Sequence, residues 1–407
     1  MDADVGVTRG LERIGILGAG TMGGGIAQVA VESGITAVVH DPIPGAYERA
    51  SERIAGFLGR KVEKGQLDAA AAASALDRLR PAASLDELAN VDLVVEAIPE
   101  DLALKRDAFE RLDAVANPAT ILATNTSSLS VGAIATATRR PERVAGMHFF
   151  NPVPLMALVE VVTGPLTAPD VAEATMQAAR RLGKTAVLAA DTPGFIVNRV
   201  ARPYYLEAMR IVGDGLAGVE EVDATMREAG FRMGPFELVD TIGADVNLAV
   251  SESIYAAFDE EPRYQPHPMQ RTLVEAGRLG RKSGAGFYDY LADGTRGAAW
   301  TGLGPIVGGP RRLAGDAIGS RVLATLVNEA ASAVADGVAP PEPIDTAMRL
   351  GANYPRGPLA WGELIGLSTV VATLDALGAD ASDRRYDVVA ILRSLSERGG
   401  SFFAAGG

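Results

Sequence analysis

The sequence predicts an α/β domain built on a parallel sheet, followed by two tandem all-α domains. From residue 13 to about residue 190, short apolar runs alternate with helix-like stretches, which is the pattern of β-α-β units. After Thr192-Pro193-Gly194 the strand-like runs cease and a helical period continues to Gly284. Beyond a stretch rich in Gly and Pro, a further helical segment repeats motifs of the first one. The expected parts are residues 1–190, 191–295 and 311–407, with 296–310 as a linker.

Within the first part, six apolar runs are candidate strands, and one long segment is predicted to be helical. The strands are expected at Arg13 to Leu17, Ala37 to His40, Leu93 to Ala97, Ile121 to Thr124, Val144 to Met147 and Leu158 to Val162. Between the second and third strands, the Ala-rich segment 46–80 is prone to form helix and is broken near Gly65. We expect it to form a protruding helical hairpin.

The repeat in the helical part consists of several motifs in nearly constant register. Val222-Asp223-Ala224-Thr225-Met226 and a later Gly234-Pro235-Phe236 match Ile344-Asp345-Thr346-Ala347-Met348 and Gly357-Pro358-Leu359. Asn198-Arg199 likewise falls opposite Ser320-Arg321. We therefore interpret the last part as a second, degenerate copy of the helical domain. The alternative is an unrelated helical extension.

Composition limits the class of protein. The chain has 407 residues, of which 48% are hydrophobic and 22% charged, as in ordinary globular proteins of two or three domains. A formal charge of −13 disfavours a nucleic-acid partner, because phosphate contacts need clustered Lys and Arg. The absence of cysteine excludes disulfides, thiolate metal sites and a Cys nucleophile. The N-terminus has no basic region before its first apolar run, so we expect no signal peptide, no membrane span and a cytoplasmic location.

A glycine-rich motif follows the first predicted strand. Gly18-Ala19-Gly20-Thr21-Met22-Gly23 leads from this strand into a helix. The first Gly permits a tight turn, the second lets backbone approach a pyrophosphate, and the third allows close packing of helix on strand. The helix N-terminus then presents free N–H groups to the anion. In this context the motif predicts a Rossmann-type dinucleotide site, although such a turn could also serve packing alone.

An acidic residue at the end of the second strand bears on the choice of cofactor. Asp41 lies about twenty residues after the motif, where a carboxylate can accept from both ribose hydroxyls. A carboxylate there repels a 2′-phosphate. The sequence therefore favours NAD over NADP.

Only three histidines are available as a catalytic base. His40 lies beside Asp41 at the expected adenosine end, and His267 lies in a Pro-His-Pro loop. His148 follows a predicted strand, and Glu160 lies on the next one. An imidazole can take a hydroxyl proton while hydride leaves the same carbon, and a carboxylate on its other nitrogen fixes the tautomer. An isolated histidine is more often structural, so the neighbouring motifs decide between these interpretations.

Those motifs resemble the 3-hydroxyacyl-CoA dehydrogenase family, in order, over roughly residues 13 to 290. They are the glycine-rich motif, Glu96-Ala97-Ile98, Asn125-Thr126-Ser127-Ser128, His148-Phe149-Phe150-Asn151-Pro152-Val153-Pro154, Glu160, Asp191-Thr192-Pro193-Gly194-Phe195-Ile196-Val197-Asn198-Arg199, Gly234-Pro235-Phe236-Glu237 and Gly284-Ala285-Gly286-Phe287-Tyr288.

The resemblance implies NAD-dependent oxidation of an (S)-3-hydroxyacyl-CoA to a 3-oxoacyl-CoA. It implies a catalytic pair of His148 and Glu160, with Ser127 and Asn198 hydrogen-bonded to the reacting oxygens. Both residue types can donate to a developing oxyanion. Ser127 could instead cap the helix that follows it. Asn198, near a helix start, carries the same alternative.

Further contacts are implied at matching positions. The cofactor would be held by Gly18, Gly20, Thr21, Met22, Gly23 and Asp41, with Glu100, Lys105 and Asn125 nearer the nicotinamide end. Arg60, Lys61 and Lys64 on the predicted hairpin are the only early basic cluster and are candidates for the coenzyme A phosphates, with Asn151 as a further substrate contact. For Glu100, Lys105 and the basic cluster, a solvated helix face is the alternative.

The second helical copy departs from single-copy members of this family, which pair two helical domains across a dimer interface. It is similar to the dehydrogenase part of multifunctional β-oxidation enzymes and to bacterial enzymes of phenylacetate degradation. Because Ser320 stands at the position that matches Asn198, we expect the second copy to be catalytically inactive. We expect either a monomer with an internal pseudo-dimer or a homodimer.

Two other functions stay open from the sequence. A relative of the L-gulonate dehydrogenase type would act on a free hydroxy acid, and a structural NAD-binding protein would not catalyse at all. The acyl group is also open, with 3-hydroxybutyryl-CoA and 3-hydroxyadipyl-CoA both compatible. No metal site is expected.

Overall fold

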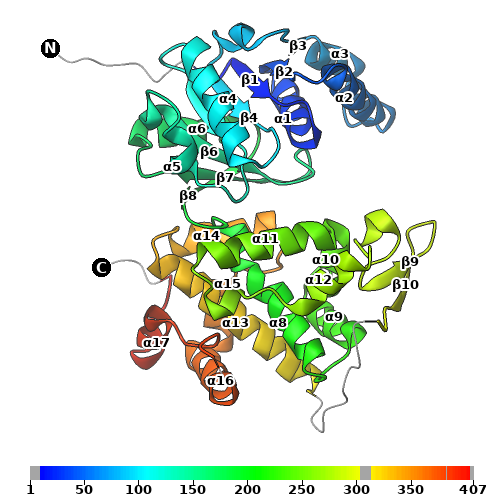
Figure 1. The fold of residues 1–407 in the computed structure, drawn as a ribbon, viewed down its shortest axis with the longest axis vertical. Helices are drawn as coiled ribbons and strands as arrows, with labels where there is room; N and C mark the ends of the chain where they lie inside the picture. Colours follow the sequence, from blue (N-terminus) through cyan, green and yellow to red (C-terminus); the bar gives the residue numbers. More distant parts are fainter. Residues whose placement is uncertain (1–9, 303–312, 382, 404–407) are drawn as a thin grey trace, which may run out of the picture. The chain divides into compact units, whose positions relative to one another are not determined.

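The structure is a computed structural model that describes residues 10–302, 313–381 and 383–403. The chain forms two compact units, Met1–Phe195 and Ile196–Gly407 (Figure 1). The first is an α/β unit and the second is almost entirely helical. The predicted linker 296–310 lies partly outside the described residues, and its first four residues form a strand, β10 (Arg296–Ala299), paired with β9 (Tyr288–Tyr290).

The α/β unit contains an eight-stranded sheet of order β3-β2-β1-β4-β5-β6-β7-β8. The strands are β1 (Arg13–Leu17), β2 (Thr36–His40), β3 (Leu79–Pro81), β4 (Leu93–Glu96), β5 (Ile121–Thr124), β6 (Val144–Phe149), β7 (Leu158–Thr163) and β8 (Thr185–Ala190). All neighbouring strands are parallel except β6 and β7. The strand order reverses between β1 and β4, and such a switch point is where open α/β sheets bind ligands.

The predicted parallel sheet is confirmed apart from the antiparallel pair β6 and β7. Only residues 150–157 connect β6 to β7. A parallel return needs a crossover of a dozen residues or more, so this short loop forces the chain to double back. Strands β3 and β8 were not predicted, because both lie at edges of the sheet. β3 has three residues and ends in proline, and β8 alternates buried with exposed side chains rather than forming a continuous apolar run.

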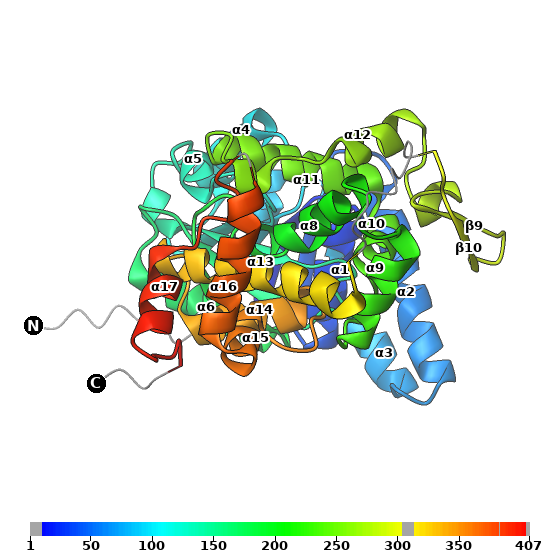
Figure 2. The same ribbon diagram turned by 90° about the horizontal axis from the view of Figure 1, so that it is seen from below.

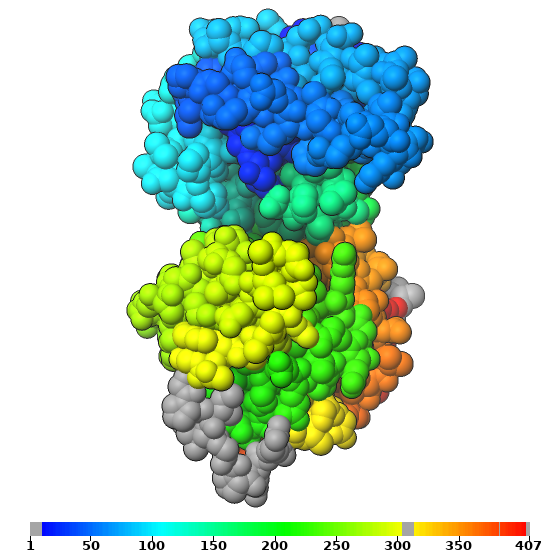
Figure 3. All heavy atoms as spheres, turned by 90° about the vertical axis from the view of Figure 1, so that its right-hand side faces the viewer, coloured from blue at the N-terminus to red at the C-terminus, as the bar shows by residue number. Residues whose placement is uncertain are grey.

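Helices cover the sheet, and two more form the predicted hairpin. The covering helices are α1 (Thr21–Glu32), α4 (Leu102–Val115), α5 (Val131–Ala135) and α6 (Pro169–Arg181). The hairpin consists of α2 (Ala46–Glu63) and α3 (Ala69–Leu76), drawn in blue in Figures 1 and 3. On α2 the buried residues Ala46, Ala50, Ile54 and Leu58 recur every fourth position. One stripe of the helix is therefore buried, and its charged residues are left to solvent.

The helical unit contains two series of helices in the same order. The first series comprises α7 (Val197–Val200), α8 (Arg202–Gly213), α9 (Val219–Glu228), α10 (Pro235–Ile242), α11 (Ala244–Ala257) and α12 (Pro268–Glu275). The second series comprises α13 (Gly315–Ala335), α14 (Pro341–Gly351), α15 (Pro358–Ile365), α16 (Leu367–Asp380) and α17 (Ala390–Glu397). Helix α13 packs along α8 at the centre of the unit (Figure 2).

The repeated Asp and Gly-Pro motifs have one structural explanation. The carboxylate of Asp223 accepts from the backbone N–H groups of Phe236 and Glu237 at 2.9 and 3.2 Å, at the start of α10. Asp345 does the same for Leu359 and Ala360 at 2.9 and 2.8 Å, at the start of α15. Each helix N-terminus thus has its free donors satisfied by an acid from the preceding helix. The motif is therefore a packing device, present in both copies.

Among the described residues, no single helix has the length and apolar composition needed to cross a membrane, although the sharply bent pair α15 and α16 meets these criteria jointly. The same part of the chain contains no group of three or more His, Asp or Glu side chains suited to a metal ion.

Candidate active site

A buried histidine–carboxylate pair lies on β6 and β7. His148 and Glu160 face each other directly in the antiparallel register. The Nδ1 atom of His148 lies 2.6 Å from Oε2 of Glu160, and both side chains are buried. The short loop that turns β6 back into β7 therefore also creates the pair. Glu160 holds Nδ1 in its protonated form, and this leaves the lone pair on Nε2.

The surroundings of His148 fix the ring further. Its centroid lies 4.4 Å from that of Phe150 and 5.8 Å from that of Phe195, so aromatic rings flank the imidazole. Asn125 follows β5, and its Oδ1 accepts from the backbone N–H of Phe149 at 2.9 Å. The predicted cofactor residue Asn125 thus also ties the end of β5 to the strand that carries the histidine.

The glycine-rich motif has the geometry that a dinucleotide requires. Gly18 has φ of 103°, and a Cβ there would lie 2.7 Å from the carbonyl oxygen of Ala97. A Cβ on Gly23 would lie 1.8 Å from the carbonyl oxygen of Gly18. Gly20, at the N-cap of α1, has open space where its Cβ would be. Gly18 and Gly23 thus close the turn, while Gly20 leaves room at the helix N-terminus, where Thr21 and Met22 begin α1. This geometry fits a pyrophosphate.

Asp41 follows β2 and contacts the glycine-rich loop. Its Oδ2 accepts from the backbone N–H of Ala19 at 2.7 Å, and its Oδ1 accepts from that of Ile43 at 2.9 Å. The carboxylate therefore stands beside the loop at the end of β2, where a ribose would be recognised. It also helps to hold the loop, a second role that the sequence did not indicate.

A buried ionic network lies at the carboxyl ends of β4 and β5. Lys105 is 1% exposed and donates to Glu96 at 2.6 Å, with Glu100 at 3.3 Å. Glu96 is fully buried and also accepts from the hydroxyl of Thr124 at 2.7 Å. The alternative of a solvated Lys105 is therefore wrong. Glu96 belongs to the motif Glu96-Ala97-Ile98 but was not predicted to be a site residue. Its position as an acidic residue at the end of an apolar strand could have indicated such a role.

Glu100 organises the segment that carries Ser127. Its Oε1 accepts from the hydroxyl of Thr126 at 2.6 Å and from the backbone N–H groups of Ser127 and Ser128 at 2.8 and 3.1 Å. Burial would raise the pKa of Glu100, but the hydrogen bond from Thr126 and the charge of Lys105 outweigh burial and lower it. Glu100 is thus an ionised, bound acceptor rather than a free surface charge.

The cap of the following helix is Ser130, not Ser127. Helix α5 begins at Val131, and Ser130 accepts from the backbone N–H of Ala133 at 3.1 Å. The Oγ of Ser127 instead lies 3.3 Å from Oε1 of Glu100. The capping interpretation of Ser127 is therefore wrong. Asn198 belongs to the helical unit, on the short helix α7, and its backbone oxygen accepts from Nε of Arg202 at 2.8 Å.

The predicted coenzyme A contacts lie on exposed parts of the α/β unit. Arg60 lies near the end of α2, with its guanidinium carbon 4.5 Å from the ring centre of Phe57. Lys61 forms an ion pair with Glu32 at 2.6 Å, and Lys64 is exposed at the C-cap of α2. Asn151 is exposed in the loop after β6. The structure places these residues at the surface without assigning them a ligand.

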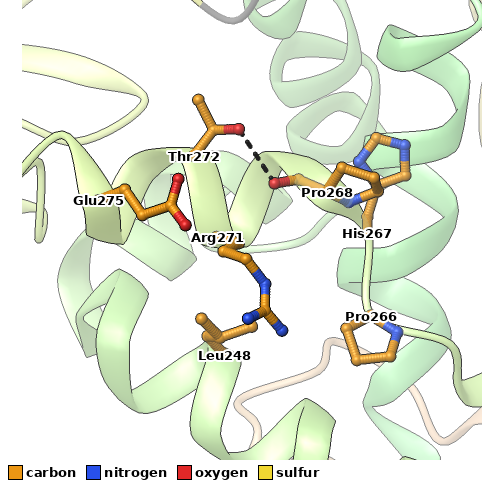
Figure 4. A pocket seen from close by; sticks show the side chains of 7 residues that line it. All are labelled: Leu248, Pro266, His267, Pro268, Arg271, Thr272 and Glu275. Carbon is orange, nitrogen blue, oxygen red and sulfur yellow. Dashed lines mark hydrogen bonds between the residues drawn. The ribbon is translucent and has the colours of Figure 1, made fainter.

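The two other histidines make structural contacts. The Nδ1 of His40 lies 3.0 Å from the carbonyl oxygen of Ala82. His267 caps α12, since its Nδ1 accepts from the backbone N–H of Met269 at 3.3 Å. Burial, together with the charges of Arg210 and Arg385, lowers the pKa of His267 to about 4. His267 lines a pocket of about 270 Å³ beside Arg271 and Glu275 in the helical unit, shown in Figure 4.

Fold and site together define a dinucleotide-dependent oxidoreductase with a histidine–glutamate pair. The 3-hydroxyacyl-CoA dehydrogenase NAD-binding domain matches residues 13–192. The C-terminal domain of the same family matches twice, at residues 194–290 and 318–401. The chain belongs to the 3-hydroxyacyl-CoA dehydrogenase family. Its cofactor is NAD, and its reaction is the NAD-dependent oxidation of a 3-hydroxyacyl-CoA.

Individual relatives agree with this assignment. The chain is 38% identical to the 3-hydroxyadipyl-CoA dehydrogenase of Escherichia coli, with 94% of this chain and 97% of that protein covered. It is 44% identical to a probable 3-hydroxybutyryl-CoA dehydrogenase of Deinococcus radiodurans, all of which aligns with 68% of this chain. A crystal structure of 3-hydroxybutyryl-CoA dehydrogenase from Escherichia coli superposes with a TM-score of 0.87 at 37% identity, covering 96% of this chain and 99% of that one.

Proposed function

We propose that His148 is the general base of this dehydrogenase and that Glu160 orients it. The observation that carries the proposal is the 2.6 Å contact between Nδ1 of His148 and Oε2 of Glu160 inside a buried antiparallel pair. A neutral imidazole held in this tautomer offers Nε2 to the 3-hydroxyl proton of the substrate. As the proton arrives, the ring becomes cationic, and the adjacent carboxylate stabilises it.

The remaining groups hold the reactants. Bound NAD would supply the acceptor for the hydride that leaves C3 of the substrate. The loop at Gly18, Gly20 and Gly23 and the first residues of α1 would receive its pyrophosphate, and Asp41 would accept from the ribose. Ser127, fixed through its N–H by Glu100, and Asn198 would donate to the reacting oxygens. Glu100, Lys105 and Asn125 would line the nicotinamide end.

We propose the hairpin as the coenzyme A contact, with Asn151 near the acyl end. Support comes from the positions of Arg60 and Lys64, which are exposed, and of the half-buried Lys61, along the last turn and C-cap of α2 in a chain of net charge −13. The phosphates of coenzyme A are anions, and clustered cations raise their local concentration.

The second copy, we infer, replaces the partner subunit of a dimer, so that residues 191–295 and 311–407 form an internal pseudo-dimer. Each copy supplies an Arg and a Tyr that bind a buried Glu of the other copy. Glu329 accepts from Arg199 at 2.7 Å and from the hydroxyl of Tyr264 at 2.6 Å. Glu207 reciprocally accepts from Arg321 and Tyr386.

These reciprocal partners occupy matched positions of the repeat. Arg199 and Arg321, Glu207 and Glu329, and Tyr264 and Tyr386 are all separated by the same distance along the chain. Reciprocal contacts of this kind define a two-fold interface between like subunits. The whole of the Deinococcus relative aligns with only 68% of this chain, so about a third of this chain has no counterpart in that alignment. Of the monomer and the homodimer that the sequence left open, we propose the monomer, and a cytoplasmic location stays a prediction.

The test is the oxidation of NADH followed by its absorbance, with acetoacetyl-CoA, with free acetoacetate and with NADPH as the control cofactor. Rapid oxidation is expected only for the thioester with NADH. Turnover of free acetoacetate at a comparable rate would instead favour a dehydrogenase of the L-gulonate type. Absence of turnover with every thioester, in protein that binds NADH, would contradict the catalytic proposal.

A further inference from the structure

A buried cation without an acidic partner lies at the start of α8. Arg202 is 4% exposed, and it donates from Nε to the backbone oxygen of Asn198 and from Nη1 to Oγ of Ser251 at 3.2 Å. Its guanidinium carbon lies 4.9 Å from the ring centre of Tyr205. No carboxylate of the described residues lies within ion-pair distance of it, so its charge is not compensated there.

The other buried arginines discussed for this unit each have a carboxylate partner, which Arg202 lacks among the described residues. Arg199 is paired with Glu329, and Arg210 and Arg321 both contact Glu207. An unpaired buried charge is costly, typically by several kcal/mol, and is retained only where something compensates it. Burial lowers the pKa of Arg202 in spite of the nearby Tyr205 and Tyr354, which is the direction expected for a cation that lacks an anion.

The polar groups around Arg202 include further hydrogen-bond donors for which the described residues provide no acceptor. Ser251, which accepts from Arg202, also accepts from Nε2 of Gln270 at 2.9 Å. The same Nε2 donates to Oδ1 of Asn247 at 2.7 Å. Among the described residues, the buried Nδ2 of Asn247 has no hydrogen-bond partner, and neither has the buried hydroxyl of Tyr354.

The orientation of the Asn247 amide is fixed by its neighbours. Oε1 of Gln270 accepts from the backbone N–H of His267 at 3.0 Å, so its Nε2 must point toward Asn247. Asn247 must then present Oδ1 to Gln270, and its Nδ2 faces away. The cluster therefore has an excess of donors and of positive charge, which is the complement of a carboxylate.

The position of the cluster connects it to the substrate. Arg202 follows Asn198 by one helical turn and is hydrogen-bonded to its backbone oxygen. In the proposed function, on which this inference rests, Asn198 contacts the oxygens of the reacting part of the acyl group. We propose that Arg202, with Asn247, binds a carboxylate at the far end of the acyl chain. The substrates are then 3-hydroxyacyl-CoA esters of dicarboxylic acids, such as 3-hydroxyadipyl-CoA.

The experiment compares two six-carbon substrates, 3-hydroxyadipyl-CoA and 3-hydroxyhexanoyl-CoA, which differ at the end of the chain by the carboxylate. For the wild-type protein, kcat/KM is expected to be about 10- to 100-fold higher for 3-hydroxyadipyl-CoA, the range of a charged hydrogen bond. Because this comparison needs no mutation, it does not depend on the folding of a variant.

Variants then assign the preference to the residue. Arg202→Met is expected to lower kcat/KM for 3-hydroxyadipyl-CoA by a similar factor while leaving 3-hydroxyhexanoyl-CoA within about two- to threefold. Arg202→Lys keeps the charge and should retain part of the preference. Arg271→Met, which removes an exposed arginine from α12, is the matched control and should retain all of it.

The outcomes separate this inference from the catalytic proposal. If wild-type protein oxidises both thioesters equally well, or if Arg202→Met lowers both equally, the carboxylate site is refuted while the dehydrogenase activity stands. If neither thioester is oxidised, the proposed function itself fails.

Discussion

A histidine acts as a general base only if one ring nitrogen has a free lone pair while the other keeps its proton. In this protein Glu160 meets that condition by holding Nδ1 of His148 from the opposite strand. Asn125 fixes the backbone of the next residue, Phe149. In the proposed mechanism, catalysis therefore depends on the orientation of the His148 imidazole.

His148→Gln is expected to lower kcat by about 10²- to 10⁴-fold, because it removes the base while leaving the glycine-rich loop intact. Steady-state kinetics measure the loss, and NADH fluorescence titration should give nearly unchanged affinity. His267→Gln is the control, since this histidine takes no part in the proposed reaction and glutamine keeps a side-chain acceptor for the N–H of Met269. Wild-type turnover in His148→Gln would exclude His148 from the mechanism.

Asp41→Ala is expected to weaken NAD binding and to reduce the discrimination against NADP, because the carboxylate that would repel the 2′-phosphate is lost. Ratios of kcat/KM for the two cofactors measure this change. Asp41 also accepts from Ala19, so part of the weaker binding will come from a looser loop.

Asp41→Asn separates the two roles of this residue, because it keeps one oxygen acceptor and removes the charge. It should bind NAD better than Asp41→Ala while still accepting NADP. An unaltered cofactor preference in both variants would show that Asp41 is not the group that recognises the ribose.

At the scale of an element, the N-terminus of α12 depends on a neutral His267. Burial lowers its pKa to about 4 from an ordinary 6.5, so between these values the unfolded chain binds the proton more readily than the folded one. Its contribution to stability is therefore fully present above pH 6.5 and is lost as the pH falls toward 4.

The free energy of unfolding, measured by urea denaturation at several pH values, should fall on acidification through this window. His267→Gln should make that fall smaller, because glutamine does not titrate. An identical pH dependence in the two proteins would show that His267 does not carry the effect.

At the scale of the whole molecule, the helical unit depends on two reciprocal clusters between its copies. Glu329 is buried and accepts from both Arg199 and Tyr264, so Glu329→Ala leaves the buried Arg199 with the exposed Asp336 as its remaining acidic partner. We expect this change to lower the free energy of unfolding by about 3 to 5 kcal/mol, as measured by chemical denaturation. The exposed Glu342→Ala is the matched control and should change it by about 0.5 kcal/mol or less.

The proposed internal pseudo-dimer also predicts the size of the protein in solution. Light scattering coupled to gel filtration should give the mass of one chain, 42.2 kDa. A stable species of twice that mass would mean that the second copy does not replace a partner subunit.

The sequence by itself determined the glycine-rich loop, six of the strands, the helical hairpin and the pairing of His148 with Glu160, because each depends on local pattern or on a motif. Only the tertiary structure revealed the edge strands β3 and β8, the reversal at β7 and the buried Lys105 with its partners. The reciprocal clusters and the unpaired charge of Arg202 also required it. Those features join residues distant in sequence, and burial, which decides whether a charged side chain is solvated or paired, exists only in the folded chain.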